Sequence, residues 1–189
     1  MLPQFRVQQD DAVMVSGDDL KTTVAAVLQK MGVPEEDAEL GADVMVLADL
    51  RGVDSHGVSN MLRSYVNGYT SGAINPRPNM RVIRETPSTA NLDSDRGLGI
   101  ITAPKGMDLA IKKAKEVGVG MVTLGNARHL GMASYHAMRA LEHDMIGVCM
   151  TSCPPRVLPT FGAEPRLGTN PIAFAVPAAK EPPFVFDAA

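Results

Sequence analysis

The stretch VGMVTLGNARHLGMASYHAMRALEHDMIGVCM, residues 119–150, decides the fold. It begins with a short apolar run at 119–124, continues with apolar residues at helical spacing over 133–142, and ends with a second apolar run at 146–150. A strand, a helix and a strand in this order are typical of chains that cover a sheet with helices. The sequence therefore predicts the α/β (α+β) class.

Helices and strands alternate on both sides of this stretch. We expect strands within 80–93, 172–176 and 184–186, a turn-rich segment at 161–171, and an amphipathic helix at 103–117. Lys112, Lys113 and Lys115 fall on the outward side of that helix. The last strand runs directly into the final residues, so we expect the sheet domain to be incomplete.

The N-terminal part reads as a helical unit. Ser16 is a candidate N-cap for a helix that ends at Gly32, and a second helix follows Pro34 and ends near residue 50. The short turn between them predicts an antiparallel hairpin. The segment GYTSGAINPRP at 68–78 reads as a loop. We therefore divide the chain into a helical unit, 1–78, and an α/β unit, 79–189.

Composition excludes several classes of protein. The net charge of -3 and the absence of Trp argue against a nucleic-acid partner. No apolar run is long enough to span a membrane, and the N-terminus lacks a signal peptide, so we expect a cytoplasmic protein. Cys149 and Cys153 have no second ligand pair nearby, so we expect buried thiols and no metal site.

Two clusters carry candidate chemistry. In DLRGVDSHG, residues 49–57, Asp54 or Ser55 is placed to orient the imidazole of His56, which titrates near neutral pH; a histidine cation at a helix end is the structural alternative. In GNARHLG, residues 125–131, His129 follows a predicted strand and should lie at its carboxyl end, where open sheets bind ligands.

Other polar features have weaker functional indications. His136 and His143 have no clustered partners, and we expect surface or capping roles for them. The pair Gly97 and Gly99 lacks the third glycine of a dinucleotide fingerprint and does not clearly open a strand-turn-helix unit. The loop at 160–171 is either a plain turn or a set of backbone amides presented to a ligand.

Four segments together resemble the malate/L-lactate dehydrogenase family. They are LRGVDSHGV at 50–58, GNARHLGMASY at 125–135, LGTNPIAFAVP at 167–177 and FDAA at 186–189. The resemblance implies hydride transfer between a 2-hydroxy acid and its 2-oxo acid with NAD or NADP as the cofactor. It also implies a homodimer and an NAD(P)-binding sheet domain unlike the Rossmann fold.

The resemblance also implies roles for individual residues. His129 matches a proton acceptor, and Ser55 and His56 match a Ser-His pair in the substrate pocket that is proposed as acid/base in some members. The sequence leaves open which of the two histidines accepts the substrate proton. Cofactor contacts are implied for Cys153, where Ser or Thr is more usual, and for Asp187, Ala188 and Ala189.

The sequence departs from the family at Asn60, where many members have an arginine that can hold the substrate carboxylate. Either Arg51 or Arg63 replaces that arginine, or the acid group is bound differently, so Arg51 and Asn60 are the candidate substrate-binding residues. The family is also considerably longer than this chain. The alternative function is therefore a catalytically inert module that binds a ligand or a partner.

Overall fold

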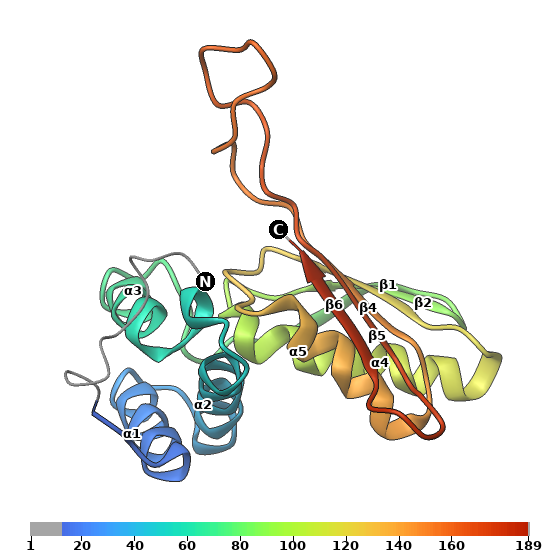
Figure 1. The fold of residues 1–189 in the computed structure, drawn as a ribbon, viewed down its shortest axis with the longest axis horizontal. Helices are drawn as coiled ribbons and strands as arrows, with labels where there is room; N and C mark the ends of the chain where they lie inside the picture. Colours follow the sequence, from blue (N-terminus) through green and yellow to red (C-terminus); the bar gives the residue numbers. More distant parts are fainter. Residues whose placement is uncertain (1–12, 189) are drawn as a thin grey trace.

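The computed structural model describes residues 13–188 and combines a helical unit with two small sheets (Figure 1). The helical unit contains α1 (Gly17–Lys30), α2 (Glu35–Leu50), the 3-10 turn η3 (Asp54–His56) and α3 (Val58–Thr70). The sheet unit contains β1 (Arg81–Glu85), β2 (Thr89–Asp93), α4 (Gly99–Val117), β3 (Met121–Gly125), α5 (Ala133–Met138), the 3-10 turn η4 (Arg139–His143), β4 (Gly147–Met150), β5 (Ile172–Val176) and β6 (Phe184–Ala188). The predicted α/β (α+β) class is confirmed.

The helical hairpin forms as predicted. The Ser16 hydroxyl accepts a hydrogen bond from the backbone N–H of Asp19 and caps α1, and Pro34 stands at the cap position of α2. Leu28 of α1 and Met45 of α2 are fully buried in the core that these helices share. The apolar stripes of the two helices therefore meet as their spacing requires.

Helix α3 corrects the predicted loop. Residues 68–78 were expected to form a loop from their first position, but α3 continues to Thr70. Tyr65 and Tyr69, four residues apart, are both buried on the core side of this helix. The burial of two aromatic rings outweighs the unfavourable helix propensity of Gly68 between them.

The first sheet has the order β1-β2-β3, with β1 antiparallel and β3 parallel to β2. Because α4 connects the parallel strands, Gly97 and Gly99 do open a strand-helix-strand unit, contrary to our expectation. The third glycine is still missing, and only one parallel pair is present among the described strands. The described part of the sheet unit is thus unlike the Rossmann fold, in agreement with the prediction.

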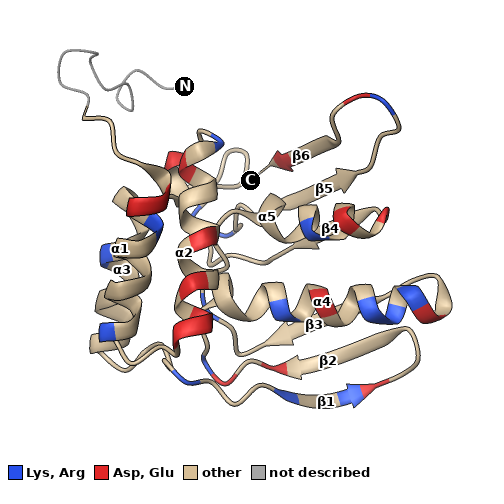
Figure 2. Ribbon diagram, turned by 90° about the horizontal axis from the view of Figure 1, so that it is seen from below, with Lys and Arg blue, Asp and Glu red and all other residues tan. Residues whose placement is uncertain are grey.

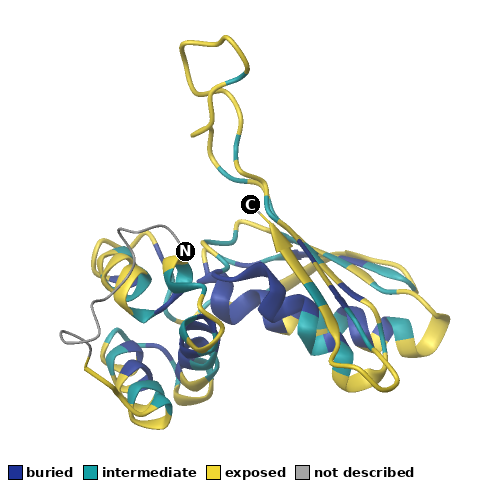
Figure 3. Ribbon diagram, in the orientation of Figure 1, coloured by how far each residue is buried: buried dark blue, intermediate teal, exposed yellow. Residues whose placement is uncertain are grey.

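The second sheet, β4-β5-β6, is antiparallel, and α5 packs on one of its faces. Its buried side presents Ala173 and Ala175 to α5. Between β4 and β5 the chain forms a long projecting arm, residues 151–171, which Figure 3 shows to be mainly exposed. The arm is paired internally between Val157 and Leu167. The turn-rich segment predicted at 161–171 forms the second part of this arm.

Three expectations about individual side chains are wrong. Lys113 is 6% exposed, because its ammonium group donates to the Thr86 carbonyl and pairs with Glu85 instead of pointing outward. His136 is 1% exposed and does not lie on the surface, because its helix is covered by the second sheet. Both cysteines are half-buried. Burial raises the pKa of the Cys149 thiol to about 11.

One apolar cluster joins the helical unit to the sheet unit. Leu98 and Ile100 at the start of α4, together with Met132 before α5, pack into the core of α1, α2 and α3. The two parts on either side of the predicted 78/79 boundary therefore share one core. The boundary itself stays a prediction. In the part of the chain from 13 to 188, no helix has the length and apolarity needed to cross a membrane.

Candidate active site

The candidate residues gather where strand ends face the helical unit. Figure 2 shows the arrowheads of β2, β3 and β6 pointing towards α2. The loop after β3 carries His129, and η3, between α2 and α3, carries Ser55 and His56. The rings of His56 and His129 are stacked with their centroids 5.4 Å apart and their planes 14° apart. Two residues that are 73 positions apart in the chain thus form one site.

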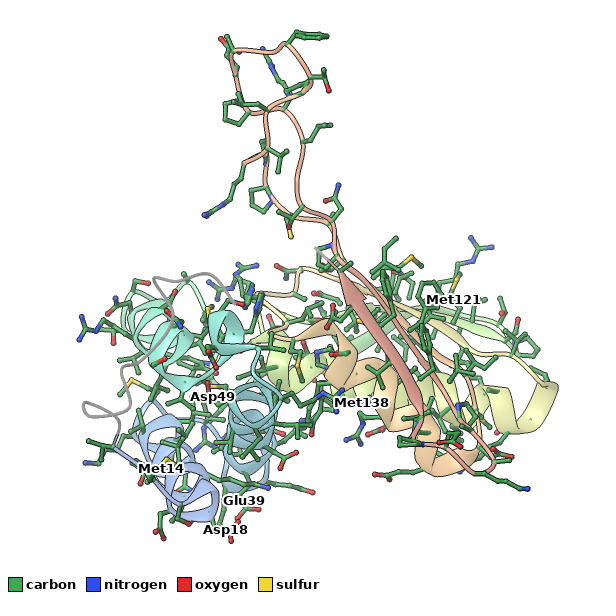
Figure 4. The ribbon with its side chains drawn as sticks, viewed as in Figure 1. Met14, Asp18, Glu39, Asp49, Met121 and Met138 are labelled. Carbon is green, nitrogen blue, oxygen red and sulfur yellow. The ribbon has the colours of Figure 1, made fainter. Side chains whose placement is uncertain are left out.

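Short-range contacts hold the turn that carries His56. The Asp49 carboxylate, marked in Figure 4, accepts a 2.9 Å hydrogen bond from the N–H of Val58 and so caps α3, which has no side-chain cap of its own. The Asn60 amide donates to the Asp54 carbonyl at 2.7 Å. The Ser55 hydroxyl lies 2.8 Å from Nδ1 of His56.

This packing requires a glycine at position 57. A Cβ built there would lie 1.6 Å from Oδ1 of Asp49. Burial raises the pKa of Asp49, and the neighbouring Asp54 carboxylate raises it further, while the bond from Val58 opposes both effects. Asp49 thus has a structural role beside the catalytic candidates.

Long-range contacts hold the loop that carries His129. The Arg128 N–H donates to the Gly97 carbonyl at 3.0 Å, and its guanidinium donates to the Ala73 carbonyl at 2.9 Å. The loop also lies directly against Gly99, where an added Cβ would be 2.4 Å from the Arg128 carbonyl oxygen. The glycine pair that fails as a dinucleotide fingerprint therefore has another use, which is close packing of this loop against α4.

Tyr65 is a member of the site that the sequence analysis missed. Its hydroxyl lies 2.8 Å from Nδ1 of His129, and its ring is 2% exposed. Burial raises the pKa of the hydroxyl, which therefore stays protonated. The spacing of Tyr65 and Tyr69 on α3 indicates only a buried face, so the sequence contained no signal for this contact.

The environment of the two rings lowers both of their pKa values. Desolvation by the surrounding protein is the main cause, and for His129 the neighbouring His56 adds to it. The Asp187 carboxylate partly opposes the shift at His56. Two stacked imidazoles repel when both are cationic, so the pair binds its protons as a coupled system. Near neutral pH the pair is poised to accept a proton.

The predicted cofactor residues lie at or just beyond the ends of β4 and β6. Cys153 follows β4 at the root of the arm, and its N–H donates to Oδ1 of Asn170 at 3.0 Å. The Asp187 carboxylate accepts a 2.7 Å bond from the N–H of Ser134, so it ties β6 to the start of α5. Ala188 is exposed at the end of β6, and Ala189 lies outside the described residues.

An open hollow of about 370 Å³ lies where β4 ends and β5 begins. It is lined by Met150, Thr151, Ser152, Asn170, Pro171 and Ile172. Among residues 13–188, no three His, Cys, Asp or Glu side chains converge in a way that could hold a metal ion.

The substrate-binding candidates are placed differently from the histidines. The Asn60 amide is engaged with the Asp54 carbonyl, as described above. Arg51 is exposed at the C-terminal cap of α2, and Arg63 is exposed on α3. The structure thus brings Ser55, His56 and His129 together.

Comparison with known proteins adds a decisive observation. The family model described as malate/L-lactate dehydrogenase matches residues 15–189. The chain belongs to the malate/L-lactate dehydrogenase family. The resemblance drawn from the sequence motifs is confirmed.

Individual relatives in this family support the same assignment. The chain is 51% identical to the malate dehydrogenase of Pyrococcus horikoshii over 95% of its own length and 49% of that protein. It is 46% identical to the L-sulfolactate dehydrogenase of Methanocaldococcus jannaschii over 86% of its length and 47% of that protein. It is 35% identical to the ureidoglycolate dehydrogenase (NAD(+)) of Escherichia coli K12, with 93% and 50% covered. The chain thus spans about half the length of the curated relatives it matches.

A solved structure agrees over the same part. The structure of the malate dehydrogenase from Pyrococcus horikoshii superposes with a TM-score of 0.92 at 50% identity, covering 97% of this chain and 52% of that one. The fold of this member of the malate/L-lactate dehydrogenase family is therefore that of about half of a dehydrogenase subunit.

Proposed function

We propose that this chain carries the acid/base residues of an NAD(P)-dependent oxidoreductase that transfers a hydride between a 2-hydroxy acid and its 2-oxo acid. The observation that supports this proposal most strongly is the stacked pair His56 and His129 at the strand ends, within a member of a dehydrogenase family. Relatives named for malate, sulfolactate and ureidoglycolate share the 2-hydroxy acid group. A homodimer and a cytoplasmic location remain predictions.

The residues at the cofactor positions fit a nicotinamide. The hollow at the end of β4 is lined by Met150 and Ile172 together with Thr151 and Ser152, and this combination of apolar and small polar residues suits a flat ring with one polar substituent. Cys153, Asp187, Ala188 and Ala189 are proposed to hold the cofactor, NAD or NADP. When bound, the cofactor supplies or accepts the hydride.

The chain's own residues move and hold the proton. During oxidation of a 2-hydroxy acid, the hydroxyl proton passes to Nε2 of His56 while the hydride leaves C2. His129 does not accept at Nε2, because its Nδ1 accepts hydrogen bonds from Tyr65 and the Gly131 N–H, so Nε2 of the neutral ring already carries a proton that it can donate to the substrate. Nδ1 of His56 is oriented by Ser55, and Nδ1 of His129 is oriented by Tyr65. Since one cationic ring disfavours protonation of the other, the pair releases its proton readily in the reverse reaction. Arg51 or Arg63 is proposed to bind the acid group, because the Asn60 amide is already engaged.

The test is turnover with the 2-oxo acids that correspond to malate, sulfolactate and ureidoglycolate. We would measure oxidation of NADH and NADPH first by the chain alone. We would then repeat the measurement with the chain co-expressed with the half of the Pyrococcus horikoshii malate dehydrogenase that has no counterpart in this chain. We expect activity in at least one form, a large loss of activity in His129→Gln and His56→Gln, and no loss in the exposed His143→Gln control. Ligand binding without turnover in both forms would overturn the proposal in favour of the inert binding module.

A further inference from the structure

We infer that His136 is a positioning residue for His129. Its Nε2 lies 2.8 Å from the carbonyl oxygen of Leu130, the residue that follows His129. A carbonyl can only accept, so Nε2 carries the proton and donates it. This inference rests on the proposed role of His129 but concerns a different residue, on α5, for which the sequence analysis expected only a surface or capping role.

The contact completes the support of the loop on both sides of His129. On the N-terminal side, Arg128 is bonded to Gly97 and Ala73. On the C-terminal side, the Leu130 carbonyl is bonded to His136. His129 therefore stands between two fixed points, and the second of them depends on one side-chain donor. Loss of that donor would leave the chain after His129 free to shift.

Packing alone does not explain a histidine at this position. His136 is 1% exposed, and its Nδ1 is buried without a hydrogen-bond partner among the described residues. A buried polar atom without a partner is unfavourable, and a phenyl ring of similar shape would avoid it. An imidazole at this position therefore carries an energetic penalty at Nδ1, and the hydrogen bond from Nε2 offsets that penalty. The edge-to-face contact with Tyr135, at 5.6 Å, is available to a phenyl ring as well.

The charge state of His136 agrees with this role. Burial lowers its pKa to about 4, the Leu130 bond and the Asp187 carboxylate oppose the shift, and Arg139 adds to it. The ring is neutral at physiological pH, with its single proton on Nε2. The charged and titratable groups that face it are Arg139 and Tyr135 on its own helical segment and Asp187 on β6.

The test compares His136→Phe, which keeps the ring, with His136→Gln, whose amide restores a donor at the same reach. The chain has four histidines, so the imidazole carbon-proton signals can be resolved by NMR and assigned by single substitutions. In folded His136→Phe we expect the His129 signal to broaden and its midpoint to rise by about 0.5 pH unit towards the ordinary histidine value. In His136→Gln and in the exposed control His143→Gln we expect the wild-type midpoint.

Two outcomes overturn the inference. One is a wild-type His129 titration in folded His136→Phe, which would mean that the ring only fills space. If His136→Phe does not fold, His136→Asn replaces it, because its shorter amide cannot reach Leu130; an Asn variant that matches the Gln variant also overturns the inference. The readout requires no turnover, so a failure here is distinct from a failure of the proposed enzymatic function.

Discussion

The turn that carries His56 and the loop that carries His129 are held in different ways. Every described hydrogen bond that fixes the turn joins residues within nine positions of each other, as Asp49 to Val58 and Asn60 to Asp54 show. The loop is fixed by residues 31 to 64 positions away, through Gly97, Ala73 and Tyr65, and by local bonds from His136 and the Gly131 N–H. Half of the site is therefore built by local sequence and half by tertiary packing.

We expect low pH to destabilise the loop that carries His129 more than the turn that carries His56. Of the changes considered below, this one should lower the free energy of unfolding the most. The pKa of His136 is about 4 in the folded chain, while an unfolded histidine titrates near 6.5. Between these values the unfolded chain binds a proton that the folded chain does not, so stability is complete above about pH 6.5 and falls as the pH drops towards 4. The lowered pKa values of His56 and His129 act in the same direction.

We expect a loss on the order of 3 kcal/mol in the free energy of unfolding across this pH window. Urea unfolding at several pH values measures it, and His136→Gln should flatten the profile. NMR should show the His129 signal leaving its folded position at a higher pH than the His56 signal. Equal stability at pH 7 and pH 4.5 would contradict the prediction.

A methyl group at position 99 should damage the loop directly. In Gly99→Ala, the new Cβ would meet three backbone atoms of residues 128–130, the closest at 2.4 Å, and backbone atoms cannot rotate away. We expect a loss of about 1–3 kcal/mol in thermal or urea unfolding, with displacement of the His129 signal. The matched control is Gly125→Ala, where the nearest atom is 3.6 Å away. Equal effects of the two substitutions would remove the argument for close packing.

The turn should respond to the loss of Asp49. Asp49→Ala removes the acceptor for the Val58 N–H and should cost about 1 kcal/mol, whereas Asp49→Asn keeps an acceptor and should cost less. The His56 signal should shift while the His129 loop keeps its contacts. Asp54→Ala is the control, because its backbone carbonyl and not its side chain accepts from Asn60. If Asp54→Ala has the same effect as Asp49→Ala, the capping role is wrong.

The same contrast explains what the sequence could predict. The Ser16 cap, the hairpin and the Ser55-His56 pair depend on neighbours in the chain, so their spacing indicated them. Tyr65 and His136 act on His129 through contacts that no local pattern specifies. The same holds for Lys113, whose ammonium group is satisfied by a turn 27 residues away. For these three side chains the sequence was insufficient because the polar group finds its partner only in the folded chain.

Tyr65 lies on α3, which follows the turn, and its hydroxyl contacts His129 of the loop, so it links the two regions. Removing this hydroxyl is the smallest change that tests the link. The Gly131 nitrogen lies 3.3 Å from Nδ1 of His129 and donates its N–H to it. Nδ1 is therefore an acceptor, and the Tyr65 hydroxyl also donates to it. This bond stabilises the neutral ring. Tyr65→Phe should therefore cost about 1 kcal/mol and raise the pKa of His129, as followed by urea unfolding and NMR titration.

Tyr69→Phe is the matched control on the same face of α3. The Tyr69 hydroxyl is buried and has no hydrogen-bond partner in the part of the chain from 13 to 188, so its removal should leave stability unchanged or slightly higher. It should not move the His129 titration. If both variants shift the His129 pKa equally, the effect comes from the packing of α3 and not from the hydrogen bond. In that case the two regions are coupled through the shared core alone.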